Sequence, residues 1–169
     1  KEQDMKKYSR ILIIVNLILL LGYFNWSVYK KEQILKDGQL VLLQLAPVDP
    51  RSLMQGDYMS LNYKEASSAL ADQQTATLGY AVLQTDSNQV GKIVRLQNTL
   101  EPVNSDELVI KYKIVHHRLF LGAESFFFEE GQDTLYQKAM YGGLKVNDKG
   151  QNLLVGLYDK DFHRIQSYK

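Results

Sequence analysis

The residues that could do chemistry gather in the stretch DPRSLMQGDYMSLNY, residues 49–63. It carries two carboxylates, Asp49 and Asp57, and one guanidinium, Arg51. An arginine can hold a carboxylate or a phosphate through two parallel hydrogen bonds, so an exposed cluster of this kind could bind an anionic group of a partner. An ion pair from Arg51 to Asp57 or to Glu130 that only keeps the loop in shape fits the spacing equally well.

A well-formed turn is the simpler interpretation of the same stretch. Gly56 can adopt backbone conformations that other residues reach only with strain, and the Asp57 carboxylate can accept a hydrogen bond from a backbone amide two residues on. We therefore expect Pro50 and Gly56, and Gly131 further along the chain, to be structural turn residues.

Aromatic residues offer a second kind of contact. Tyr58 and Tyr63 are five positions apart, so on a regular strand they face opposite sides and at most one belongs to the core. The other could stack on a partner. Phe126, Phe127 and Phe128 cannot all face one way on a strand either, and we expect one of them to be exposed to a partner or to a membrane surface. Phe127 is also a candidate binding residue.

Hydrolytic chemistry is the enzymatic alternative. A strand, a proline-containing loop and a Gly-Asp pair are faintly similar to the serine-lysine signal peptidases, whose serine is activated by a lysine of lowered pKa. No serine or threonine lies between Gly38 and Pro50, however, and Ser52 follows the proline. The candidate lysine, Lys92, has the sequence context of a solvated hairpin residue. Glycosidase chemistry is also disfavoured, because the adjacent Glu129 and Glu130 would diverge on a strand.

These considerations predict a protein without catalytic residues. A degenerate hydrolase, or a domain that binds a peptide or sugar through Asp49, Arg51, Asp57 and Glu130, stays open as the alternative. Composition excludes further classes: 20 Lys+Arg against 19 Asp+Glu give no nucleic-acid footprint, and the absence of cysteine excludes disulfides and thiolate zinc sites. The three histidines make a poor basis for a metal site, so we expect no metal and no cofactor.

An apolar segment near the N-terminus is expected to span the membrane and so to hold any such site close to the membrane surface. The run from Ile11 to Tyr29 contains no charged residue over 19 positions, long enough for a helix to cross a bilayer core. Lysines and an arginine flank it, and Tyr23, Trp26 and Tyr29 resemble an interfacial belt. No small-residue cleavage site follows, so we expect an uncleaved signal anchor with its N-terminus in the cytoplasm. Asn16 and Asn25 could hydrogen-bond to a neighbouring helix or be tolerated alone.

From residue 38 onward the pattern is that of short strands and turns. We expect a fold that is mainly β, with residues 1–37 as tail and anchor helix and residues 38–169 as a compact β-rich domain. It should contain two β-hairpins, one or two short helices and a long strand. The expected strands cover residues 39–47, 58–63, 107–122 and 125–131; the hairpins cover 80–97 and 143–159; the helices cover 64–74 and 133–141.

Residues 56–63 fit the pattern G-D-Y-x-x-L-x-Y at every fixed position, and the chain thereby resembles the GDYXXLXY family of bacterial membrane-anchored proteins. Residues 49–53 are similar to the family's D-P-R-x-L segment and residues 127–131 to its F-x-x-E-G segment. The resemblance implies a single-pass anchor in the inner membrane followed by a periplasmic domain of no established activity, often encoded next to a multi-pass membrane protein. We therefore expect an extracytoplasmic binding or accessory domain whose partner is such a protein.

Overall fold

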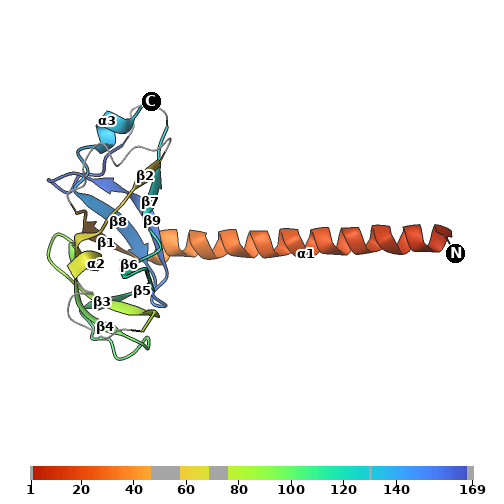
Figure 1. Ribbon diagram of the computed structural model, residues 1–169, viewed down its shortest axis with the longest axis horizontal. Helices are drawn as coiled ribbons and strands as arrows, with labels where there is room; N and C mark the ends of the chain where they lie inside the picture. Colours follow the sequence, from red (N-terminus) through yellow and green to blue (C-terminus); the bar gives the residue numbers. More distant parts are fainter. Residues whose placement is uncertain (1, 47–57, 69–75, 130, 167–169) are drawn as a thin grey trace.

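The computed structural model describes residues 2–46, 58–68, 76–129 and 131–166 of the 169-residue chain. A single long helix projects from a β-rich domain (Figure 1). The expectation of a mainly β fold with an N-terminal apolar helix is confirmed.

Helix α1 covers Glu2–Asp37. Within the described residues it is the one helix long and apolar enough to cross a membrane, over Ile11–Asp37, and the domain buries none of its most apolar window. At about 1.5 Å per residue these 27 residues span about 40 Å, more than the roughly 30 Å of a bilayer core. The helix continues two turns past Tyr29 because no proline or glycine interrupts it before Gly38.

Gly38 alone separates α1 from the first strand. Its amide donates to the carbonyl oxygen of Ile34 at 3.0 Å, and its own carbonyl accepts from Lys145 Nζ at 2.7 Å. A Cβ atom at this position would lie 2.4 Å from the Ile34 carbonyl oxygen, so glycine is required. Ile34 is itself buried against the domain. The helix and the domain are thus joined without a flexible linker.

The domain is built from antiparallel strands in three sheets. The first sheet has the order β1-β8-β9, with β1 at Gln39–Gln44, β8 at Tyr141–Val146 and β9 at Asn152–Tyr158. The second has the order β4-β3-β5-β6, with β3 at Leu78–Thr85, β4 at Gly91–Gln97, β5 at Glu107–Val115 and β6 at Arg118–Phe120. A short ribbon pairs β2, Tyr58–Ser60, with β7, Ser125–Phe127.

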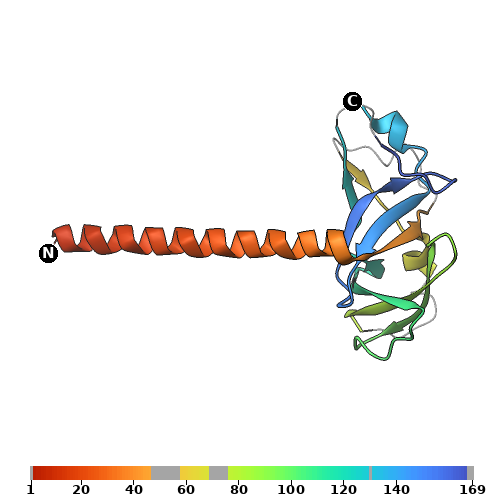
Figure 2. The same ribbon diagram turned by 180° about the vertical axis from the view of Figure 1, so that it is seen from behind.

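The core lies between the two larger sheets. Its fully buried large side chains come from five of their strands and include Leu43, Leu83, Ile110, Leu144 and Leu157. Two short helices, α2 at Lys64–Ser68 and α3 at Asp133–Tyr136, lie over its edges (Figure 2). Both fall within the predicted helical segments.

Turn residues made the two predicted hairpins recognisable. Between β3 and β4, Asp86 Oδ1 accepts from the amides of Asn88 and Val90, each at 2.9 Å. Between β8 and β9, Gly150 has a φ of +72°, the left-handed conformation that favours glycine. Both hairpins are present as the sequence predicted.

The prediction of one long strand over residues 107–122 was wrong. The chain reverses at His116 and His117, with φ values of 48° and 57°, and β6 folds back on β5. Two left-handed residues in succession form the kind of tight turn that suits the twist of paired strands. The two histidines are therefore exposed turn residues and do not lie on the faces of a strand.

Candidate functional site

Strand β2 and the residues that follow it alternate between core and surface. Met59, Leu61 and Tyr63 are 3%, 2% and 2% exposed, whereas Tyr58, Ser60 and Asn62 face outward. This is the alternation predicted from the sequence, and it splits the stretch into a buried and an accessible set.

Tyr63 belongs to the buried set. Its hydroxyl donates to the carbonyl oxygen of Ala123 at 2.6 Å, and its ring fills the space beside Gly142, where a Cβ atom would lie 2.9 Å from a ring carbon. Burial, aided by the charge of Glu124, raises the pKa of the Tyr63 hydroxyl well above its usual value. The sequence offered Tyr63 as a binding residue, but in this position it ties β2 to the segment before β7 and is not accessible to a partner.

Tyr58 and Phe127 form an exposed aromatic pair. They are opposite each other in the β2–β7 register, their ring centroids are 5.8 Å apart, and their exposed fractions are 38% and 73%. Phe126 and Phe128 instead turn inward and pack on Tyr136, with centroid distances of 4.9 and 5.4 Å. One of the three phenylalanines is therefore exposed, as expected, and it is Phe127.

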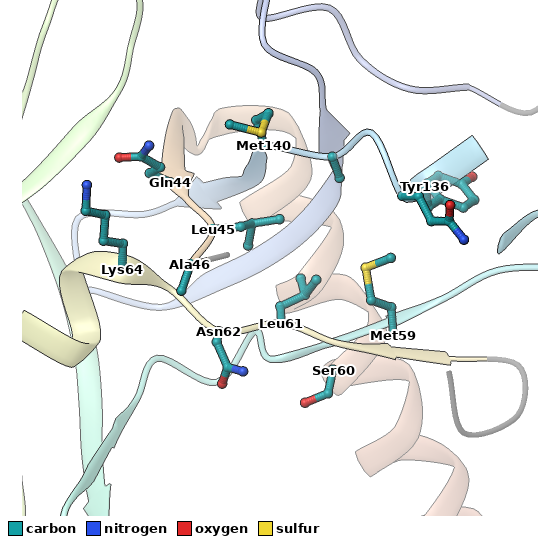
Figure 3. A pocket seen from close by; sticks show the side chains of 12 residues that line it. Gln44, Leu45, Ala46, Met59, Ser60, Leu61, Asn62, Lys64, Tyr136 and Met140 are labelled. Atoms are coloured by element: carbon teal, nitrogen blue, oxygen red, sulfur yellow. The ribbon is translucent and has the colours of Figure 1, made fainter. Parts of the chain in front are cut away.

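A groove of about 320 Å³ lies beside β2, and Met59 and Leu61, from the buried set, point toward Leu45 and Tyr136 across it (Figure 3). At the groove, the residues after β1 join those after β2, where the amide of Ala46 donates to the carbonyl of Asn62 at 2.7 Å. They also join the segment before β8, where the amide of Leu45 donates to the carbonyl of Met140 at 2.9 Å. Apolar side chains make up much of the wall: Leu45, Met59, Leu61, Tyr136, Ala139 and Met140. Polar residues also line it: Gln44, Ser60, Asn62, Lys64 and Gln137. Helix α2, which begins at Lys64, lies on the side of the domain away from α1 (Figures 1 and 2).

The polar lining has unused hydrogen-bonding capacity. Lys64 Nζ and the Ser60 hydroxyl have no hydrogen bond or ion pair to any described residue, whereas Asn62 Oδ1 accepts from Arg118. An apolar hollow with an ammonium group at its edge that is unpaired among the described residues suits a ligand that is apolar in part and carries an acceptor or a negative charge. Among the residues that the structure describes, no cluster of histidine and acidic side chains could hold a metal ion.

Most of the charged residues singled out in the sequence lie outside the described residues, namely Asp49, Arg51, Asp57 and Glu130, as do Pro50 and Gly56. The structure does describe Gly131, whose φ of +82° and position in a turn closed from Gln132 to Glu129 agree with its expected turn role. The groove residues Met59 and Met140 were missed. They are 81 positions apart, so only the fold brings them together.

Comparison with protein families gives one match, over residues 20–157, to the family described as GDYXXLXY protein. The chain belongs to the GDYXXLXY family. This confirms the resemblance seen in residues 56–63. Searches of curated proteins and of solved structures found no match.

The GDYXXLXY motif can now be read on the structure. Two of its specified positions, Leu61 and Tyr63, are core residues, and a third, Tyr58, is the exposed partner of Phe127. The positions that the motif leaves open, Met59, Ser60 and Asn62, all line the groove. The motif therefore specifies residues that hold the strand, including Leu61 in the groove wall, and leaves three other lining positions open.

Proposed function

We propose that this chain is a membrane-anchored binding subunit whose domain lies outside the cytoplasm of a bacterial cell and recognises a multi-pass protein of the same inner membrane. The observation that carries the proposal is the exposed Tyr58–Phe127 pair beside a groove lined by the open positions of the motif.

The groove and the aromatic pair have the composition of a protein-binding surface. Tyrosine, phenylalanine and methionine are enriched at the centres of interfaces, where rigid rings supply contact area and methionine adapts its shape to the partner. The groove, at about 320 Å³, is large enough to accept one or two apolar side chains. Lys64 at its edge can then pair with an acceptor or a carboxylate on the partner.

The anchor supports a partner within the membrane. The side chains of α1 from Ile11 to Leu21 are all exposed, and Asn16 among them has no hydrogen bond to any described residue. Asn25 differs, because its side-chain amide donates to the carbonyl of Leu21 in its own helix at 2.8 Å. A neighbouring transmembrane helix would satisfy Asn16, and a multi-pass protein supplies such helices.

Orientation is tested by reporter fusions at the C-terminal residue, Lys169. We expect a periplasm-dependent reporter to be active there and a cytoplasm-dependent reporter to be silent. The reverse pattern would place the domain in the cytoplasm and exclude a periplasmic partner.

Partner recognition is tested by capture from detergent-solubilised membranes, with bound multi-pass proteins quantified by mass spectrometry. The double variant Tyr58→Ser/Phe127→Ser should reduce capture at least about tenfold, because aromatic side chains at interface centres commonly contribute 2 kcal/mol or more. The control Val94→Ser removes a side chain of similar exposure, 47%, from β4 and should leave capture unchanged. Equal capture by both variants would show that the aromatic pair is not the recognition surface.

A further inference from the structure

The domain begins close to the membrane surface. Lys30 Nζ lies 5.2 Å from the ring centroid of Trp26, as expected where a lysine reaches from the end of a span toward the headgroups. The eight residues from Lys30 to Asp37 add about 12 Å along the helix axis. Each headgroup layer takes about 5–7 Å of that length. Side chains on the face of the domain nearest the membrane can bridge the remaining distance to the headgroups.

One side of the domain is fixed as the near face. α1 packs against β8 and β9, and the rigid junction at Gly38 leaves no linker about which the domain could turn. The turn between β8 and β9 and the beginning of β3 lie on the side from which α1 leaves (Figures 1 and 2).

A group of lysines and apolar side chains lies on the outer face of β3 and β5 beside that turn. The register pairs Leu78 with Lys113 and Tyr80 with Lys111, which places these four side chains on one face of the sheet. The amide of Lys111 donates to the carbonyl of Gly150 at 2.9 Å, which brings in the turn that carries Lys149. We call Leu78, Tyr80, Lys111, Lys113 and Lys149 the basic face.

The charges of the basic face are not neutralised within the described chain. Lys111, Lys113 and Lys149 are exposed and form no ion pair with any described carboxylate. Asp148, the neighbour of Lys149, lines a different hollow, together with Glu101 and Glu107. Leu78 is 64% exposed, and Lys111 Nζ lies 6.0 Å from the ring centroid of Tyr80. Cations interleaved with exposed apolar and aromatic groups are typical of surfaces that meet lipid headgroups.

We propose that the basic face binds the phosphate groups of anionic phospholipids in the leaflet from which α1 emerges. A lysine near an anionic membrane surface contributes about 1 kcal/mol, so three lysines favour the docked orientation about 100-fold. The inference rests on the membrane anchoring in the proposed function. It adds a second surface, on a different side of the domain from the groove at Lys64.

The test uses the full chain in nanodiscs of phosphatidylcholine, alone or with phosphatidylglycerol. The acetylation rate of each lysine by an amine-reactive reagent is measured by mass spectrometry. Lys111, Lys113 and Lys149 should react at least about threefold more slowly in the anionic discs, and high salt should abolish the difference because headgroup attraction is screened. Lys64, on the far side of the domain, is the internal control and should react equally in both. Equal rates for the basic face in the two discs would overturn the proposal.

A variant separates attraction by charge from simple closeness to the membrane. In Lys111→Gln/Lys149→Gln the protection of Lys113 by phosphatidylglycerol should be lost, whereas Lys64→Gln should preserve it. Protection that persists in the double variant would overturn the proposal. Partner capture by the double variant should stay at the wild-type level because Tyr58 and Phe127 are intact. Loss of partner capture in Tyr58→Ser/Phe127→Ser with intact lipid protection would show that the two surfaces act separately. Loss of lipid protection in Lys111→Gln/Lys149→Gln with intact partner capture would show the same.

Discussion

Tyr63→Phe tests whether the last residue of the motif acts through its hydroxyl group. The change keeps the ring beside Gly142 and removes the only donor that the Tyr63 side chain offers to the Ala123 carbonyl. Ala123 is 4% exposed, so water cannot readily replace the lost donor. An unsatisfied buried carbonyl costs about 1–3 kcal/mol. We expect a loss of about 1–2 kcal/mol in the free energy of unfolding, because the phenylalanine ring is slightly easier to bury.

The loss should appear as a fall in Tm of about 3–8 °C for a domain of this size. Near-UV circular dichroism of the full chain in detergent is the suitable assay, since the single tryptophan, Trp26, lies in α1 and does not report on the domain. Tyr58→Phe is the matched control. The Tyr58 hydroxyl has no hydrogen bond to any described residue, so its removal should change stability by less than about 0.5 kcal/mol. Equal melting of the two variants would refute the reasoning.

Three further predictions concern the framework. The hydrogen bonds from Arg95 lower the pKa of Glu107 to about 2. Their contribution to stability is therefore complete above the ordinary carboxyl pKa near 4.5 and is lost as the pH falls toward 2. Glu107→Gln should remove this part of the acid dependence of Tm. Gly38→Val should distort the helix–domain junction and make it susceptible to limited proteolysis in detergent, where the wild type resists. Asp86→Ala should lower stability by about 1 kcal/mol, because two turn hydrogen bonds are lost, whereas Asp148→Ala should not; equal melting curves would argue against the turn as a source of stability.

Local patterns in the sequence were enough to predict the long apolar helix, the two hairpins and the two faces of β2. In each case the deciding signal lies within a few residues, such as Asp86 and Gly150 in their turns. The turn at His116 and His117 was missed because it contains neither glycine nor asparagine, the usual signals of such a turn, and the apolar alternation of β5 continues into β6. The groove was missed for a different reason, since it depends on pairings between β1, β2 and residues near Met140.

The positions of the motif residues in the structure explain why the motif identifies a family without indicating a chemical reaction. Leu61 and Tyr63 contribute to the core, and the Tyr63 hydroxyl is committed to a backbone carbonyl, so neither is free to act on a ligand. Leu61 also lines the groove, together with Met59, Ser60 and Asn62, the three positions where the motif imposes no residue type. Asp57, the acidic residue that the motif specifies, lies outside the described residues. A strand of fixed packing that presents variable side chains beside an exposed aromatic pair suits recognition of a partner, and the partner's own surface would then decide which side chains occupy those three positions.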